Sequence, residues 1–167
     1  RFFIAVLSTG VFCRPTCPAR TPAEHNVRYF ANAAAASDAG FRPCKRCRPE
    51  DSLPMPEWVL GNPHIVRALR FIDAGFLNQQ PTAALAQQLG ISERHLDRMF
   101  VAALGATPAS IARFKRAQLA RQLLSTALPL HRVAEHAGYG SVSQFNREVK
   151  KFFRLAPSQL RQGRGSA

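Results

Sequence analysis

Four cysteines, all within the first 47 residues, form two close pairs: Cys13 with Cys17 and Cys44 with Cys47. The pairs have C-x3-C and C-x2-C spacing, and 26 residues separate them. Such pairs can close two disulfides or supply four thiolates to a tetrahedral Zn²⁺. The opening apolar run is too short for a secretory leader, so an oxidising compartment is not indicated. We therefore expect one zinc ion with all four cysteines as its ligands.

A four-cysteine zinc site admits two kinds of chemistry. In most proteins it is structural and stabilises a small domain. The alternative is nucleophilic, because zinc keeps a thiol deprotonated at neutral pH and a thiolate attacks carbon without a histidine base. Basic residues surround both pairs and could hold a DNA backbone near the sulfurs: Arg14, Arg20, Arg42, Lys45, Arg46 and Arg48. The residues alone leave both chemistries open.

The net charge indicates a polyanionic partner. The 167 residues include 23 Lys or Arg and 10 Asp or Glu, for a formal charge of +13. Nucleic acid is the commonest partner of such a chain. Residues 1–53 carry 8 basic and 4 acidic side chains, which leaves +9 on the remainder. A hydrophobic content of 46% excludes a mainly disordered chain, and no apolar run approaches the ~20 residues that cross a bilayer.

The elements that must position the cysteines are short. They are predicted as a strand over residues 2–7, a turn over 8–10, a strand over 27–30, a helix over 33–39 and a proline-flanked loop over 41–49. Asn32 can cap the helix and Gly40 can end it. About 50 residues bury only a small core, so a metal is needed to hold this part together.

From His64 onward the pattern is helical and free of cysteine. Apolar residues recur there at a spacing of three or four, which predicts one amphipathic helix with Ile65, Leu69, Ile72 and Phe76 on its apolar face. The expected organisation is a zinc domain over residues 1–53, a proline-rich linker over 54–63, a helical domain over 64–161 and a tail over 162–167.

One helical pattern occurs twice in the second domain. The repeated parts are a helix, a glycine stop and a serine cap: residues 82–89, Gly90 and Ser92 in the first unit, and residues 130–137, Gly138 and Ser141 in the second. A long helix that begins at Pro108 connects the two units. This order predicts a doubled helix-turn-helix.

A helix-turn-helix reads DNA by placing its second helix in the major groove. The exposed side chains expected at the bases are Arg94, His95 and Arg98 in the first unit and Ser143, Asn146 and Arg147 in the second. The expected phosphate contacts of this domain are Arg113, Lys115, Arg116, Lys150, Lys151 and Arg154. The alternative is a plain helical bundle, which two consecutive turns with capped, basic second helices disfavour.

These motifs resemble the DNA-binding domain of AraC-family transcription regulators. The matching runs are Leu89-Gly90-Ile91-Ser92, Leu96-x-Arg98-x-Phe100 and Val133-Ala134-x-x-Ala137-Gly138-Tyr139-x-Ser141-x-Ser143-x-Phe145-x-Arg147. The resemblance covers about residues 64–161, and Val149 departs from it where the family usually has Phe. It implies an all-α domain with two helix-turn-helix units that binds specific DNA sites.

The cysteine region resembles the N-terminal domain of the Ada family of bacterial DNA-repair proteins. The matching runs are Thr9-Gly10-Val11-Phe12-Cys13-Arg14-Pro15-Thr16-Cys17-Pro18-Ala19-Arg20 and Ala39-Gly40-Phe41-Arg42-Pro43-Cys44-x-Arg46-Cys47-x-Pro49. The resemblance covers nearly all of residues 1–50, and an AraC-type domain follows in that family too. It implies a small α+β domain around a four-cysteine zinc site.

The second resemblance also implies a function. Cys13 would take the methyl group of a DNA methyl phosphotriester irreversibly, and the methylated chain would activate genes of the alkylation response. The phosphate contacts expected near Cys13 are Thr9, Arg14, Arg20, Arg42 and Arg46. The expected partners are double-stranded DNA and RNA polymerase, with no membrane. We expect a monomer at the nucleoid of the bacterial cytoplasm.

Three other functions compete with this expectation. The chain could be a transcription factor whose zinc is purely structural, a sensor of free electrophiles, or the regulatory part of an AlkA-type glycosylase fusion. Repair of methylated guanine is not expected, because Pro43-Cys44-Lys45-Arg46 lacks the histidine of the Pro-Cys-His-Arg motif and belongs to the cysteine pairs.

Overall fold

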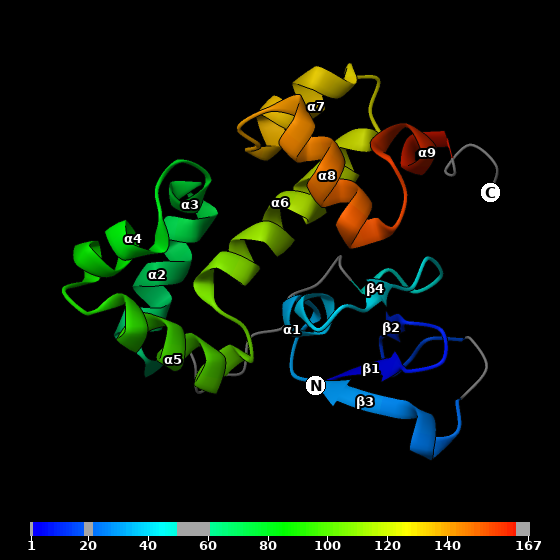
Figure 1. Cartoon of the computed structure of the whole chain (residues 1–167), viewed down its shortest axis with the longest axis horizontal. Coiled ribbons are helices and arrows are strands. Elements are labelled where there is room, and N and C mark those ends of the chain that lie inside the picture. The colour runs from blue at the N-terminus through cyan, green and yellow to red at the C-terminus, as the bar shows by residue number, and fades with distance from the viewer. Residues whose placement is uncertain (1, 19–21, 50–60, 163–167) are drawn as a thin grey trace.

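The protein consists of a small sheet-containing region followed by a helical region (Figure 1). The computed structural model describes residues 2–18, 22–49 and 61–162. Arg20, most of the predicted linker and residues 163–167 of the predicted tail lie outside the described residues. The expected fold class, a small α+β domain with four cysteines and then an all-α domain with two helix-turn-helix units, is confirmed.

A four-stranded sheet in the order β3-β1-β2-β4 carries the cysteines. Its strands are β1 Phe3–Val6, β2 Val11–Cys13, β3 Val27–Phe30 and β4 Arg42–Pro43. β1 pairs antiparallel with β2 and β3, whereas β2 and β4 run parallel. The parallel register sets Phe12 beside Pro43. The next residues, Cys13 and Cys44, therefore come together at the same end of the sheet.

Helix α1, Ala33–Asp38, covers this small sheet. The predicted cap is confirmed, because the Asn32 side chain accepts a hydrogen bond of 2.8 Å from the Ala35 amide. Two strands were not predicted: β2, Val11–Cys13, and β4, Arg42–Pro43, which falls in the predicted loop over 41–49. A short 3-10 turn, η1 Glu24–Asn26, precedes β3.

The helical region contains eight described helices. They are α2 Pro63–Asp73, α3 Phe76–Gln79, α4 Thr82–Leu89, α5 Glu93–Leu104, α6 Pro108–Leu124, α7 Leu130–Ala137, α8 Val142–Phe153 and α9 Pro157–Gln162. Gly90 ends α4 and Gly138 ends α7, both in the left-handed conformation that glycine adopts at low cost. Ser92 and Ser141 cap the helices that follow. Both predicted helix-turn-helix units are therefore present.

The prediction of one amphipathic helix through Phe76 is wrong. Gly75 has a φ of 88°, which ends the first helix, and a new helix begins at Phe76. Phe71 and Phe76 pack edge to face across the break, with their ring centroids 5.3 Å apart. Phe76 therefore lies on the apolar side although the helix has ended. Periodicity therefore extended beyond the helix, and the glycine was the better signal.

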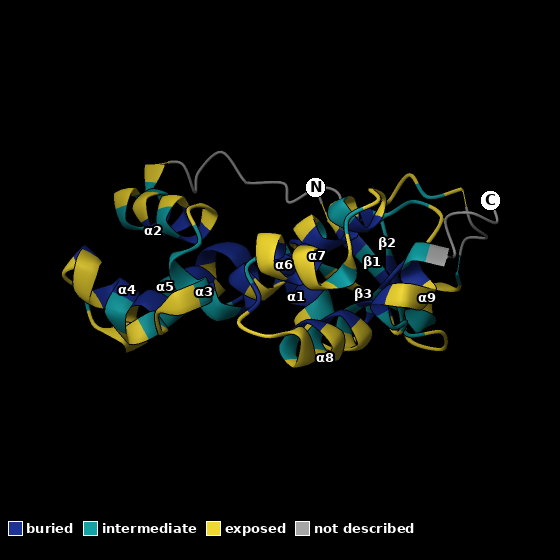
Figure 2. Cartoon of the chain, turned by 90° about the horizontal axis from the view of Figure 1, so that it is seen from above, coloured by how far each residue is buried: buried dark blue, intermediate teal, exposed yellow. Residues whose placement is uncertain are grey.

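Two buried clusters hold the chain together, and α6 contributes to both. The first joins the sheet and α1 to α2, α4, α5 and the first half of α6, and the second joins the end of α6 to α7, α8 and α9. Figure 2 shows buried residues continuing from α1 into α6. No helix among the described residues is both long enough and apolar enough to cross a membrane.

Candidate metal centre and nucleic-acid interface

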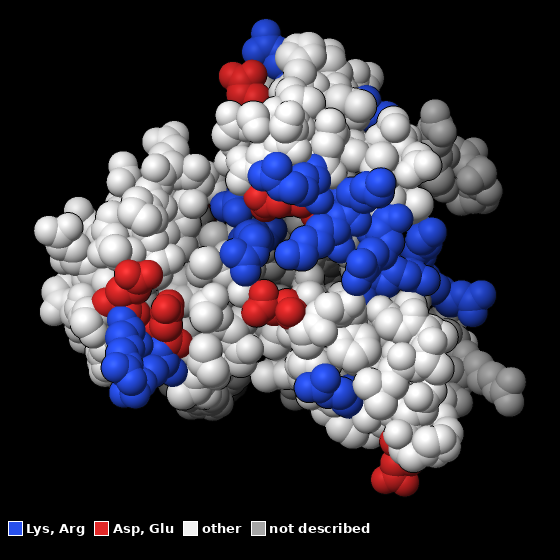
Figure 3. Space-filling view, in the orientation of Figure 1, with Lys and Arg blue, Asp and Glu red and all other residues white. Residues whose placement is uncertain are grey.

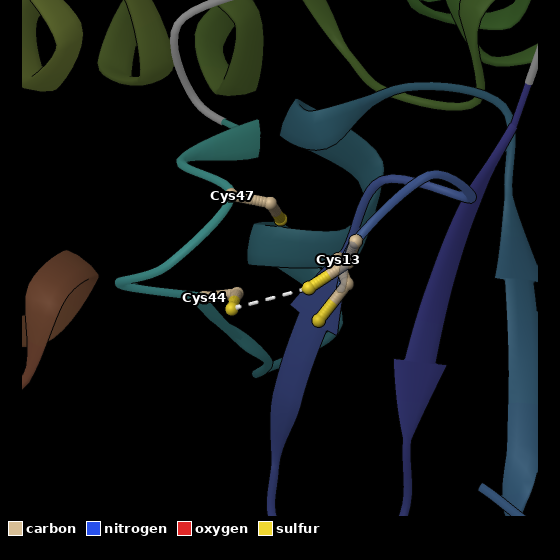
Figure 4. Close-up of side chains that lie close together, drawn as sticks. Cys13, Cys44 and Cys47 are labelled. Carbon is tan, nitrogen blue, oxygen red and sulfur yellow. Dashed lines mark hydrogen bonds between the residues drawn. The ribbon is translucent and has the colours of Figure 1, made fainter. Parts of the chain in front are cut away.

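Four cysteine sulfurs converge at the end of the sheet. Cys13 ends β2, Cys17 lies in the loop that follows, and Cys44 and Cys47 follow β4. Their sulfurs all lie within 4.8 Å of one another, and Cys17 Sγ is 3.9 Å from Cys44 Sγ. Tetrahedral zinc with bonds of about 2.3 Å needs sulfurs about 3.8 Å apart. The four free cysteines therefore fit one zinc ion, and Figure 4 shows Cys13, Cys44 and Cys47 approaching from two segments.

The surroundings of Cys13 and Cys47 make these two thiols difficult to ionise without a cation. Burial raises the pKa of the Cys13 thiol well above its usual value, and the neighbouring cysteines raise it further. Burial likewise raises the pKa of Cys47 to about 12, against the hydrogen bond from the Arg14 amide. Burial also acts on Cys44, but backbone amides of Cys47 and Arg46 outweigh it and lower that pKa. A bound divalent cation would stabilise the thiolates together.

A cavity of about 720 Å³ opens beside Cys13, Cys17 and Cys44. Three of the predicted phosphate contacts line it: Thr9, Arg14 and Arg42. Arg46 is exposed in the loop between Cys44 and Cys47, outside the cavity lining. Arg14 is also held within the protein, because its guanidinium donates to the Arg48 carbonyl at 3.0 Å. The cavity thus places basic donors next to a sulfur.

The predicted base contacts lie on the outer faces of the second helices. All six are exposed: Arg94, His95 and Arg98 on α5, and Ser143, Asn146 and Arg147 on α8. The opposite faces are buried through Leu96 and Phe100 in α5 and through Phe145 and Val149 in α8. Each second helix therefore offers its polar face to a partner, as a recognition helix must.

One predicted phosphate contact is wrong. Arg116 is 9% exposed, and its guanidinium pairs with Glu148 at 3.3 Å and donates to Asn78 Oδ1 at 2.9 Å. It joins α6 to α3 and α8 instead of facing solvent. Helical spacing could have indicated that Arg116 is buried, because Ala112 and Ala120, four residues away on either side, lie on the same buried face of α6. No local pattern in the sequence indicated Asn78 or Glu148 as its partners.

Many of the described Lys and Arg side chains lie together on one face of the molecule (Figure 3). Figure 3 shows Lys and Arg in a band across the face where α6 and α8 meet the cysteine region. Within it, Arg113, Arg147 and Lys151 line a groove shared with α1. This concentration of charge suits the phosphate backbone of a nucleic acid.

Two protein families match the chain: the metal binding domain of Ada over residues 1–50 and a helix-turn-helix domain over residues 85–163. The bifunctional transcriptional activator/DNA repair enzyme AdaA of Bacillus subtilis is 33% identical over 164 residues, which are 97% of this chain and 75% of that protein. The chain belongs to the Ada family. Its resemblance to that family, drawn above from motifs, is confirmed.

This Ada-family chain is also similar to a curated protein and to a solved structure. A Mycobacterium tuberculosis protein named "Probable bifunctional transcriptional activator/DNA repair enzyme AlkA" is 45% identical over 161 residues, or 96% of this chain and 32% of that protein. The chain thus spans about a third of that relative. The C-terminal domain of AraT, a response regulator from Geobacillus stearothermophilus, has 31% identity and a TM-score of 0.58 over 61% of this chain and 86% of that chain.

The predicted cofactor of this Ada-family chain is confirmed as one Zn²⁺ held by four cysteines. The family match covers the whole cysteine region, and all four sulfurs lie within 4.8 Å of one another. Zinc also explains how about 50 residues with a small core keep a defined fold.

Proposed function

We propose that this chain repairs methyl phosphotriesters in DNA by transferring the methyl group to Cys13, and that its helix-turn-helix units activate transcription. One observation carries the proposal: the cavity lined by Cys13, Cys17 and Cys44 combines sulfurs with donors for phosphate oxygens, from Thr9, Arg14 and Arg42. The choice of Cys13 as the acceptor rests on the resemblance to the Ada family. The Bacillus and Mycobacterium relatives are named both as DNA repair enzymes and as transcriptional activators. Arg20 and Arg46 are the remaining proposed phosphate contacts.

The proposed transfer is a single displacement. Bound zinc keeps the thiol deprotonated at neutral pH. Cys13 Sγ attacks the methyl carbon, so the S–C bond forms while the C–O bond breaks and its electron pair leaves with the phosphodiester oxygen. No proton moves, and no histidine base is needed. A thioether does not return its methyl group, so each chain reacts once.

The transfer also changes the charge that the protein presents to DNA. A methyl triester is neutral, so it is repelled less by the thiolate cluster than an ordinary phosphodiester is. Once methylated, Cys13 no longer carries a negative charge. One unit charge at about 4 Å contributes on the order of 1–4 kcal/mol, depending on the effective dielectric. The methylated chain should therefore bind DNA roughly fivefold to several hundredfold more tightly.

The helix-turn-helix units would convert this affinity into gene control. Their proposed base contacts are Arg94, His95 and Arg98 in α5 and Ser143, Asn146 and Arg147 in α8. Two units in one chain can read two adjacent segments of the major groove, so we propose a monomer that recruits RNA polymerase. The work would be divided between residues 1–53 and 64–161, and it would take place at the nucleoid of the bacterial cytoplasm.

The test uses a duplex that carries one methyl phosphotriester. Mass spectrometry should find one added methyl group on the peptide that contains Cys13, and none after incubation with the unmodified duplex. Arg42→Ala should slow the transfer about tenfold, because it removes one charged donor from the cavity. Lys45→Ala is the matched control, since Lys45 is exposed and outside the cavity lining, and it should change the rate much less.

Two results would overturn the repair proposal. If zinc-loaded protein gains no methyl group, the four cysteines are structural and the chain is a transcription factor only. If methyl iodide methylates Cys13 readily while the triester duplex does not, the chain senses free electrophiles.

A further inference from the structure

The zinc domain is docked on the helical domain through α1. Ala33, Ala34, Ala35 and Ala36 are all buried, in the cluster that also contains residues of α5 and α6. The approach is close, because a Cβ on Gly105 would lie 3.4 Å from the Ala35 Cβ. Figure 1 shows α1 between the sheet and α6.

Polar contacts reinforce this docking. The Asn32 amide group donates to the Leu104 carbonyl at the end of α5. The Arg113 guanidinium of α6 pairs with Asp38 Oδ1 at 3.3 Å, and that of Arg154, just after α8, donates to the Gly40 carbonyl at 2.9 Å. Both arginines belong to the set expected to contact DNA phosphates. In the docked arrangement, acceptors of the zinc domain hold them instead.

A groove of about 240 Å³ lies between the zinc domain and the helical domain, where α1 faces α6 and α8. Arg147 and Lys151 line it from one side, and Ser37 and Asp38 line it from the other. Arg147 and Lys151 lie one turn apart on α8, and Arg154 follows the end of that helix. All three side chains are exposed beside the zinc domain.

We propose that docking of the zinc domain is autoinhibitory: α1 and Gly40 compete with DNA phosphates for Arg113 and Arg154. DNA binding by the helix-turn-helix units would then require the zinc domain to move off α6 and α8. Because binding energies are linked, DNA must weaken the docking by the same factor by which docking weakens DNA binding. This inference rests on the proposed DNA binding of the helical domain.

Two variants separate the domains in different ways. Ala35→Gln adds bulk where α1 meets Gly105 and leaves the charge unchanged. Asp38→Asn releases Arg113 and adds one unit of positive charge. Asp73→Asn is the matched control, because Asp73 of α2 pairs with Lys115 of α6. Like Asp38→Asn it adds one positive charge and releases one cation, but the contact that it breaks lies within the helical domain.

The measurement is fluorescence anisotropy with a labelled duplex of about 30 base pairs, long enough for two units one helical turn apart. If about one chain in ten is undocked, Ala35→Gln should tighten the dissociation constant about tenfold. Asp38→Asn should tighten it by about threefold, within the range of an exposed ion pair. Asp73→Asn should have a smaller effect. Adding duplex to the unaltered chain should accelerate hydrogen exchange of the α1 amides.

The outcomes distinguish a failure of the autoinhibition from a failure of the proposed DNA binding. An unaltered chain that shows no salt-dependent binding to the duplex overturns both. A chain that binds the duplex, but whose affinity is unchanged or weakened by Ala35→Gln with one zinc retained, overturns the autoinhibition alone. If Ala35→Gln loses its zinc, the test rests on Asp38→Asn. Equal gains in affinity from Asp38→Asn and Asp73→Asn would show that the added positive charge alone tightens DNA binding, and would overturn the autoinhibition.

Discussion

In the first helix-turn-helix unit Gly90 turns the chain between α4 and α5 with no atom within 4 Å of where a Cβ would stand. In the second unit Gly138 occupies the equivalent turn, but a Cβ there would clash with Asn78 Nδ2. Both glycines have a positive φ, of 73° and 99°. The turn conformation is thus shared, whereas close packing from a distant helix is found only in the second unit.

The recognition helices differ in the same way. α8 is tied to α6 and α3 through Glu148, Arg116 and Asn78, and its end reaches the zinc domain through Arg154. α5 contacts its neighbours through apolar side chains such as Leu96 and Phe100, and the Leu104 carbonyl at its end accepts a hydrogen bond from Asn32 of the zinc domain. A repeat in sequence therefore specifies two similar turns, but residues outside the repeat decide how each recognition helix is joined to the rest of the molecule.

The largest expected difference between the units comes from alanine at the two glycines. Gly138→Ala should cost about 3 kcal/mol of unfolding free energy, because strain at positive φ adds to the hydrogen bond that Asn78 loses when it moves. Gly90→Ala should cost only the strain, about 1 kcal/mol. Urea unfolding of both variants measures the difference. Equal losses would mean that Asn78 yields freely and the units are equivalent.

The buried ion pair gives the next largest effect. Arg116→Met should cost about 2 kcal/mol, because Glu148 and Asn78 lose their partner in a site whose ion-pair side chains are only 10% and 20% exposed. Arg132→Met is the control. Arg132 pairs with Glu135 at the same distance of 3.3 Å, but both side chains are more than half exposed, so the cost should stay below about 0.5 kcal/mol.

A second change tests the cause of that cost. Replacing Glu148 with Leu as well should recover part of the loss, since the unpaired carboxylate is then removed. If Arg116→Met and Arg132→Met unfold at the same urea concentration, the pair is not part of what couples α8 to α6.

Local signals explain which parts of the fold could be predicted from the sequence. Asn32, Ser92 and Ser141 act through neighbours three residues away, and Gly90 and Gly138 end helices by their own conformation. Four cysteines in two close pairs were sufficient to predict the metal centre. Such features need no knowledge of the rest of the chain.

Long-range partners explain what could not be predicted. β4 is only two residues long and contains a proline, so it shows no alternation, and it exists because β2 lies beside it. Arg116 looks like a surface cation until Glu148 and Asn78 are brought to it. The docking of α1 on α6 joins residues more than 70 positions apart. No short window of sequence contains both partners of these contacts.

The smallest predicted difference concerns the third residue of each recognition helix. Gln144 accepts a hydrogen bond of 2.7 Å from the Gly140 amide and donates one of 2.7 Å to Glu148, whereas its counterpart His95 is an exposed, proposed base contact. Gln144→Ala should therefore cost about 0.5–1 kcal/mol of stability. His95→Ala should leave the unfolding transition unchanged and weaken binding to duplex DNA instead. The reverse pattern would mean that α5, not α8, is the helix held in place by its surroundings.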